Sequence, residues 1–179
     1  MQDESQLIER HLIEMLTLAG EYCITIEKSD QSDKNELLIF LSKISPMLYL
    51  RGILFPVTEE PDEEGDERVV TQEQWENLFN SLRIKFGTDD VFNFLDYNSP
   101  EQDEISKGSL SELFADVYQD MKDFVWLMTK NSLVSRKYAA YDIKQLFISN
   151  WGPKLLLAQS MLHSKVLLSP IPDEYSDLE

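Results

Sequence analysis

The chain has 179 residues, of which 33 are Asp or Glu and 16 are Lys or Arg, so its net charge is −17. Hydrophobic residues make up 42% of the sequence, which is too many for an intrinsically disordered chain. The negative charge argues against binding to nucleic-acid phosphates or to an anionic membrane surface. The single cysteine excludes an internal disulfide bond and a thiolate zinc site, and the two histidines leave few ligands for a histidine-based metal site.

The start of the chain does not have the pattern of a secretory signal. Residues 1–9 carry acids where such a signal carries bases. No stretch of the sequence approaches the ~20 apolar residues of a membrane-spanning helix. We therefore expect a cytoplasmic protein with no membrane contact, and the free Cys23 agrees with that compartment.

Two helices are predicted in the first third of the chain. Apolar residues recur at steps of three and four over residues 8–26 and again over residues 37–48, as in helices that bury one face. The polar residues 29–35 between them form a turn. Pro46 should kink or end the second helix, because proline has no N–H and clashes with the preceding turn.

A strongly acidic block follows at residues 58–67, where seven of the ten residues are Asp or Glu. Such a block repels itself and is typical of a flexible loop. The alternative is that it acts as a decoy for basic partners.

Two further helices begin at recognisable caps. Thr71 and Gln74 have the spacing of a capping box, and the helix that follows should end at Gly87. Ser109 and Glu112 form a second such pair, ahead of the clearest apolar stripe in the chain at residues 110–128.

The segment at residues 91–97 is aromatic and partly alternating, so it is either a lone strand or an extended segment clamped on the helices. No second strand of comparable quality is visible, which favours the extended segment. Residues 98–107 are a polar loop.

The end of the chain predicts two more helices. The first covers residues 133–149 and is interrupted at Gly152 and Pro153; proline suits the first turn of a last helix that runs to about residue 165. The sequence therefore predicts an all-α fold, with a single-domain bundle of about six helices over residues 1–168 and an acidic tail at 169–179.

A row of acids on the predicted fourth helix is the main candidate site. Glu112, Asp116, Asp120 and Asp123 fall within about 80° of one another around the helix. Asp is a poor residue for a helix interior, and acids four residues apart repel each other. The row therefore requires positive charge from elsewhere.

A divalent metal is one source of that charge, because hard cations take carboxylate ligands and bundles build such sites from facing helices. Glu14 or Glu21 of the first helix would then complete the site.

Internal basic residues are the other source, and we favour them. Residues 124–172 contain six Lys or Arg and one acid. A short turn near residues 130–132 makes the fourth and fifth helices antiparallel. Counting outward from that turn places Lys144 beside Asp116 and Asp120, and Arg136 or Lys137 near Asp123. On this prediction no metal and no cofactor is needed.

The remaining reactive residues indicate no catalytic site. His11 and His163 stand alone and are expected to be half-buried side chains with satisfied hydrogen bonds. Cys23 lies on the apolar face of the first helix, where burial makes a thiol inert. The sequence contains no glycine-rich phosphate loop and no Gly-x-Ser-x-Gly nucleophile elbow.

Several short motifs together resemble a known family. They are Glu21-Tyr22-Cys23, Pro46-Met47-Leu48-Tyr49, Trp75 after an acidic loop, Ser109-Leu110-Ser111 with the run from Ala115 to Phe124, and Trp151-Gly152. In these residues the chain resembles the bacterial domain of unknown function 5063, a family of small acidic proteins from Bacteroides-like bacteria. The resemblance implies an all-helical domain and supplies no activity. The family has a further acid where this chain has Leu113.

These observations favour a non-enzymatic, cytoplasmic protein-binding or regulatory module, whose partner is a protein that presents a basic surface. One alternative is a metal-dependent hydrolase that uses the acid row on the fourth helix. A second is an acidic mimic of nucleic acid.

Overall fold

The computed structural model describes residues 2–61, 68–95 and 105–167. Their α-helices are α1 (Gln2–Glu27), α2 (Lys34–Leu54), α3 (Gln72–Phe86), α4 (Leu110–Thr129), α5 (Leu133–Leu146) and α6 (Gly152–Leu162). Three shorter helical turns are η1 (Gly87–Asp89), η2 (Phe147–Trp151) and η3 (His163–Leu167), and two strands are β1 (Val91–Leu95) and β2 (Ile105–Ser109).

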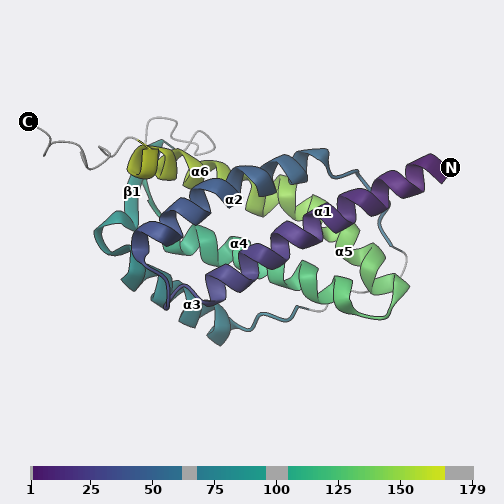
Figure 1. The fold of residues 1–179 in the computed structure, drawn as a ribbon, viewed down its shortest axis with the longest axis horizontal. Coiled ribbons are helices and arrows are strands. Elements are labelled where there is room, and N and C mark those ends of the chain that lie inside the picture. Colours follow the sequence, from purple (N-terminus) through teal and green to yellow (C-terminus); the bar gives the residue numbers. More distant parts are fainter. Residues whose placement is uncertain (1, 62–67, 96–104, 168–179) are drawn as a thin grey trace, which may run out of the picture.

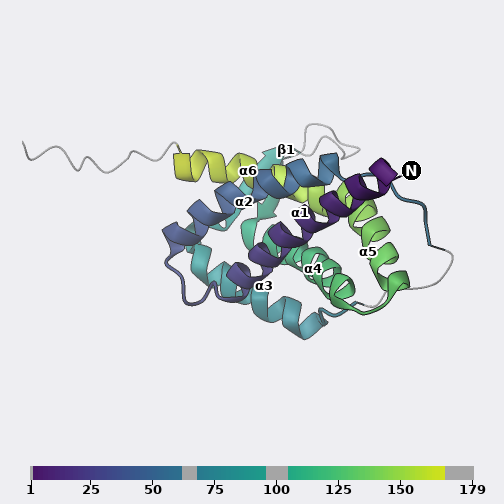
Figure 2. The same ribbon diagram turned by 45° about the vertical axis from the view of Figure 1, so that its right-hand side comes forward.

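Helix α4 lies at the centre of the bundle (Figure 1). It packs against α1, α3, α5 and α6, while α2 lies on the outside against α1 and α6. Figure 2 shows the same arrangement from a second direction, with α2 and α6 side by side. The core is built from large side chains of all these helices, among them Tyr22, Leu48, Phe86, Phe114 and Trp151, which are fully buried.

The mostly helical architecture agrees with the predicted class, but the helix count differs. The chain runs from α5 through η2, α6 and η3 without leaving a helical conformation, so the described residues form five helical rods. The expected interruption at Gly152 and Pro153 is instead a π-helical turn, after which Pro153 occupies the first turn of α6. Gly152 is required there, because a Cβ atom would lie 2.2 Å from the carbonyl oxygen of Phe147.

The aromatic segment near residue 91 is a strand, and its partner was missed. β1 pairs antiparallel with β2, with Val91 opposite Ser109 and Leu95 opposite Ile105. Residues 105–107, expected in a polar loop, belong to β2, which has a single large apolar residue and hence no strand-like composition. Gly108 in β2 lets the Phe92 ring lie flat on the backbone, since a Cβ atom there would lie 2.6 Å from that ring.

Helix α2 continues through Pro46, so the prediction that this residue could end the helix is wrong. Proline cannot donate to the carbonyl of Ser42, four residues earlier. That carbonyl instead accepts a hydrogen bond from Nε2 of Gln159 on α6, at 3.4 Å. A side chain of the neighbouring helix α6 thus supplies the carbonyl of Ser42 with the hydrogen-bond donor that Pro46 lacks.

The predicted caps are confirmed. Thr71 and Gln74 form a reciprocal capping box, and Gly87 ends α3 with a φ of 58°, which suits glycine. Ser109 caps α4 by accepting a hydrogen bond from the N–H of Glu112 at 3.2 Å.

One helix among the described residues, α2, is long and apolar enough to span a membrane, with a mean hydropathy of 1.5 over its best window. The expectation that no stretch comes near this threshold therefore does not hold. Core helices of soluble proteins pass the same test, and Leu41 and Leu48 of α2 are fully buried in the bundle.

Two predictions fall wholly or mostly outside the described residues. Residues 62–67 of the acidic block and the tail from residue 168 onward are not described. Residues 58–61, at the start of the acidic block, form neither helix nor strand.

Candidate functional site

The acid row on α4 divides into inward-facing and outward-facing members. Asp120 is 5% exposed, Asp123 is 1% exposed and Asp116 is half-buried. Glu112 is exposed in the first turn of α4, where the positive end of the helix dipole favours an acid. Glu21 of α1 is also exposed. Three of the four acids in the row therefore belong to the interior of the bundle.

Asp116 is held from two sides. Its Oδ1 accepts a hydrogen bond from Nε1 of Trp75 on α3 at 2.9 Å, and its Oδ2 forms an ion pair with Nζ of Lys154 on α6 at 2.6 Å. The Trp75 ring is in turn stacked on Phe79, with centroids 5.3 Å apart. Asp116 thus joins α3 and α6 across the central helix.

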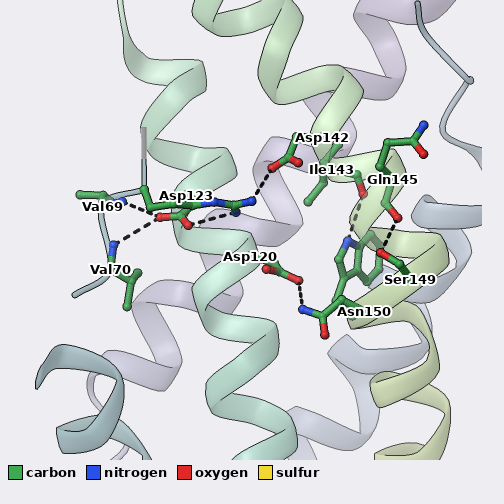
Figure 3. A network of polar contacts seen from close by, with 11 residues as sticks. Val69, Val70, Asp120, Asp123, Asp142, Ile143, Gln145, Ser149 and Asn150 are labelled. Atoms are coloured by element: carbon green, nitrogen blue, oxygen red, sulfur yellow. Dashed lines mark hydrogen bonds and ion pairs between the residues drawn. The ribbon is translucent and has the colours of Figure 1, made fainter. Parts of the chain in front are cut away.

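Asp123 binds the segment that leads into α3 (Figure 3). Its Oδ1 accepts hydrogen bonds from the backbone N–H groups of Val69, at 2.8 Å, and Val70, at 3.3 Å. Its Oδ2 lies 3.3 Å from Nη1 of Arg68. A buried carboxylate with this many donors is well satisfied.

Arg68 bridges two acids from different helices. Its Nη2 lies 3.3 Å from Oδ2 of Asp142 on α5, while its Nη1 contacts Asp123 on α4. Partial burial acts to lower the pKa of Arg68, but the nearby carboxylates of Asp142, Asp123 and Asp120 outweigh it, so the pKa is raised. The guanidinium group stays charged and links α4 to α5.

Asp120 is the least compensated acid of the row. Its Oδ2 accepts a hydrogen bond from Nδ2 of Asn150 in the π-helical turn η2, at 2.7 Å (Figure 3). Burial raises the pKa of Asp120 to about 6, against the opposing effects of Asn150, Arg68 and Lys154. A carboxyl group with a pKa in this range can exchange a proton near neutral pH.

Lys144 is not the counter-charge of the row, which corrects the prediction. It is buried, and its Nζ donates to the carbonyl oxygens of Gly52, at 2.7 Å, and Ile53, at 3.3 Å. These carbonyls belong to the last turn of α2, where the helix itself supplies no N–H donor and a cation is favoured. Burial lowers the pKa of Lys144, and Phe147 lies beneath the ammonium group, with the ring centroid at 5.2 Å.

Arg136 and Lys137 do not neutralise the row either. Both are exposed, and Nε of Arg136 donates to the carbonyl of Lys130 at 3.2 Å. The cations that do reach the row are Lys154 and Arg68, neither of which was predicted. Arg68 was recognisable as the first base after the acidic block, but the sequence has no feature that singles out Lys154.

A metal site at this row finds little support in the geometry. Donors from the protein already occupy oxygens of Asp116, Asp120 and Asp123. Across residues 2–61, 68–95 and 105–167, no three His, Cys, Asp or Glu side chains are grouped so that they could hold an ion. The proposed completing residue Glu14 instead pairs with Arg10 and Arg51 of α1 and α2.

The isolated reactive residues behave differently from one another. Cys23 is buried as predicted, with 3% exposure, and burial raises the pKa of its thiol to about 12. His163 is exposed rather than half-buried. His11 is partly buried, but its Nδ1 has no hydrogen-bond partner in the described part of the chain, contrary to expectation.

Comparison with known families shows to which family the chain belongs. The model of the domain of unknown function DUF5063 matches residues 6–167, which run from within α1 to the end of η3. The chain belongs to the DUF5063 family. The predicted resemblance is thereby confirmed, and it covers the acid row together with Arg68, Asn150 and Lys154.

A similar fold has been seen in a crystal. The structure of protein BF1032 from Bacteroides fragilis is similar to this chain, with a TM-score of 0.76 and 28% sequence identity. The similarity covers 86% of this chain and 90% of that one. No curated protein matches the sequence.

Proposed function

We propose that this DUF5063 domain is a non-enzymatic, cytoplasmic protein-binding module whose partner presents a basic surface. The observation that carries the proposal is the division of the acid row. Asp116 and Asp123 are engaged by Lys154, Trp75, Arg68 and backbone N–H groups, so they act as cross-links between helices. The acids that remain for a partner are those on the surface.

Four of the exposed acids lie on three helices, of which α4 contacts the other two. Glu21 on α1, Glu73 and Glu76 on α3, and Glu112 on α4 are exposed, and α4 packs against both α1 and α3. A net charge of −17 produces a field that attracts a basic partner and speeds its association. The nucleic-acid mimic, by contrast, requires acids at fixed spacing on the surface, and Asp116, Asp120 and Asp123 of the row face inward.

The proposal can be tested with one matched pair of variants. A partner captured from the native host at low salt is purified and titrated against the chain. We expect the variant with Glu21→Gln, Glu73→Gln, Glu76→Gln and Glu112→Gln to bind it roughly tenfold more weakly, since each exposed pair contributes ~0.2–1 kcal/mol. The control variant replaces the exposed neutral residues Gln31, Asn77, Asn80 and Thr88 with Ala. Equal affinity of the acid variant and the wild type would contradict the proposal.

The raised pKa of Asp120 is the one observation that favours the alternative of a metal-dependent hydrolase, because perturbed carboxyl groups often occur at catalytic sites. Calorimetric titration with Mg²⁺, Mn²⁺ and Zn²⁺ separates the two functions. Binding of any of these ions that Asp120→Asn abolishes would favour the hydrolase.

A further inference from the structure

The outward side of α2 is apolar over most of its length. Five large side chains on it are 42–52% exposed: Ile39, Met47, Leu50, Ile53 and Leu54. On the neighbouring helix α6, Leu156 is 51% exposed, and Pro153 and Ser160 are exposed beside it. We call this surface, together with the exposed Lys43 and Pro46 of α2, the α2–α6 face. Large apolar patches usually mark an interaction site.

A groove joins the two helices within this face. It encloses about 140 Å³, and its walls include Pro46, Tyr49, Leu50 and Ile53 of α2 and Leu155, Leu156 and Gln159 of α6. An apolar cavity of roughly 150 Å³ holds a benzene molecule. The groove therefore has room for one apolar side chain from a facing surface.

The α2–α6 face carries little charge, unlike the rest of the chain. The sequence has no acid from Leu37 to Val57 and none in α6 or η3, although 33 of its 179 residues are Asp or Glu. Four bases of these elements form ion pairs within the bundle: Lys34 and Lys165 with Asp89, Arg51 with Glu14, and Lys154 with Asp116. A strongly charged partner therefore finds little to pair with on this face.

A second copy of the chain is the occupant that this charge pattern favours. Two copies, each with a net charge of −17, repel each other wherever their acids meet. Salt screens such repulsion beyond about 8 Å, so the charges that matter most are those at the contact itself. A face without acids is thus the surface at which two copies can touch at the lowest electrostatic cost, and one neutral apolar face is complementary to another.

The exposed side chains along α2 have the spacing of a helix-pairing seam. Exposed residues follow one another at alternating steps of four and three, as the a and d positions of a coiled coil do: Ile39, Lys43, Pro46, Leu50 and Ile53. In an antiparallel pair, Leu50 lies opposite Pro46 of the second copy, and Lys43 lies opposite Ile53 of the second copy. The same two contacts recur in the reverse direction, so the seam is complementary to itself. The stem of Lys43 then covers apolar surface while its ammonium group reaches water.

The size of the α2–α6 face suits a dimer. Helices α2 and α6 lie side by side (Figure 2). Residues 39–54 span about 23 Å of helix and two adjacent helices are about 20 Å wide, so each copy offers a footprint of roughly 450 Å². Specific interfaces bury upward of about 500 Å² per partner. Because ridged side chains expose more area than their footprint, the face reaches this range near its lower end, which predicts a dimer of micromolar affinity.

From the lack of acids on this face, its seam spacing and its area, we propose that two copies of this chain associate through their α2–α6 faces, with the two α2 helices antiparallel about a two-fold axis. The same axis stacks α6 on α6 of the second copy. A contact of this kind uses the same patch on both copies, so the assembly stops at a dimer. The proposal does not depend on the partner-binding function proposed above, because it uses none of the exposed acids of α1, α3 and α4.

Sedimentation equilibrium of the full chain over a range of concentrations tests the proposal. We expect a monomer–dimer equilibrium, which Leu50→Glu and Leu156→Glu should each weaken roughly tenfold or more, because each places an unpaired charge in an apolar contact. The two variants lie on different helices, and circular dichroism checks that each is folded. Ile84→Glu adds the same charge at a residue of α3 that is 83% exposed, and it should leave the equilibrium unchanged. A wild type that stays monomeric at roughly 1 mM would overturn the proposal, as would a dimer that all three variants weaken equally.

Cross-linking tests the antiparallel arrangement. The two copies of Met47 lie near the two-fold axis, about 10 Å apart across the helix pair. A short bismaleimide should therefore join Met47→Cys into dimers several-fold faster than Ile84→Cys at the same concentration, while the buried Cys23 stays unlabelled. Equal rates for the two variants would overturn the proposal. Monomers that bind vesicles of uncharged phosphatidylcholine, with binding abolished by Leu50→Glu, would assign the face to a membrane and overturn it as well.

Discussion

Asp123 on α4 accepts a hydrogen bond from the backbone N–H of Val69 at 2.8 Å, across 54 residues of sequence. The same oxygen accepts from Val70, so one buried carboxylate fixes the approach to α3. These hydrogen bonds account for an aspartate, a residue that disfavours helix interiors, in the middle of the central helix α4. Asp123 gives the backbone of residues 69 and 70 the partners that no helix or sheet supplies to them.

Replacing Asp123 with Ala should therefore destabilise the protein by about 2–4 kcal/mol. The change leaves the N–H groups of Val69 and Val70 without acceptors and removes a partner of Arg68. Urea unfolding measures the loss. Glu112→Ala, at an exposed site on the same helix, is the control and should cost less than 1 kcal/mol. Similar losses in both variants would show that the carboxylate of Asp123 is not the anchor.

Asp120 should make stability depend on pH. Its pKa is about 6 in the folded protein and 3.8 in the reference state, so the folded state binds more protons between these values. The protein should therefore lose stability as the pH rises from about 4 to above 6. Asp120→Asn should be more stable than the wild type at pH 7.5, by roughly 1–3 kcal/mol.

Urea unfolding of both proteins at pH 5 and pH 7.5 checks this prediction. The advantage of Asp120→Asn should shrink at the lower pH, where the wild-type carboxyl group is already protonated. A variant that is less stable than the wild type at both values would show that the charged form of Asp120 is the one the fold favours.

Cys23 should react slowly with a thiol reagent in the native protein. It is buried, and the pKa of its thiol is raised to about 12, so very little thiolate forms at neutral pH. Labelling should be much faster in urea. Cys23→Ser should cost about 1–3 kcal/mol, because it leaves a hydroxyl group in an apolar site. Native labelling at the rate of the unfolded chain would mean that α1 exposes this face.

A double-mutant cycle should locate the counter-charge of the acid row. Asp116 and Lys154 form an ion pair at 2.6 Å, and both side chains remain about a quarter exposed. We expect a coupling free energy of ~0.5–1 kcal/mol between Asp116→Asn and Lys154→Met. The matched cycle of Asp120→Asn with Lys144→Met should give a coupling near zero. The reverse order of the two couplings would restore Lys144 as the neutralising residue.

The sequence was sufficient to predict the helical class, the caps at Thr71 and Ser109 and the burial of Cys23, because each depends on local spacing. It also indicated correctly that the row on α4 needs cations from elsewhere in the chain. The identity of those cations depends on tertiary geometry. Counting residues back from the α4–α5 turn assumed two straight neighbouring helices, whereas the structure places α6 against the row as well, after a π-helical turn.

The missed strand β2 has a similar explanation. Its residues are poor strand formers, and its pairing with β1 brings Gly108 against the ring of Phe92, where a larger residue would not fit. Pairing partners of this kind are set by a close contact between two segments, which the composition of either segment alone does not reveal.

The contacts of α5 have a consequence for where this chain can accept an insertion. Lys144 holds the carbonyl groups at the end of α2, and Asp142, two residues earlier, holds Arg68. A single turn of α5 thus contacts the chain at Gly52 and Ile53 and again at Arg68. Because closing a longer loop adds only about 0.6 kcal/mol per doubling of its length, we expect residues inserted after the exposed Glu60 to have little effect on the bundle, whereas Phe55, which is 3% exposed, has to keep its place in the core. This is the natural point for inserting a reporter peptide or a second domain.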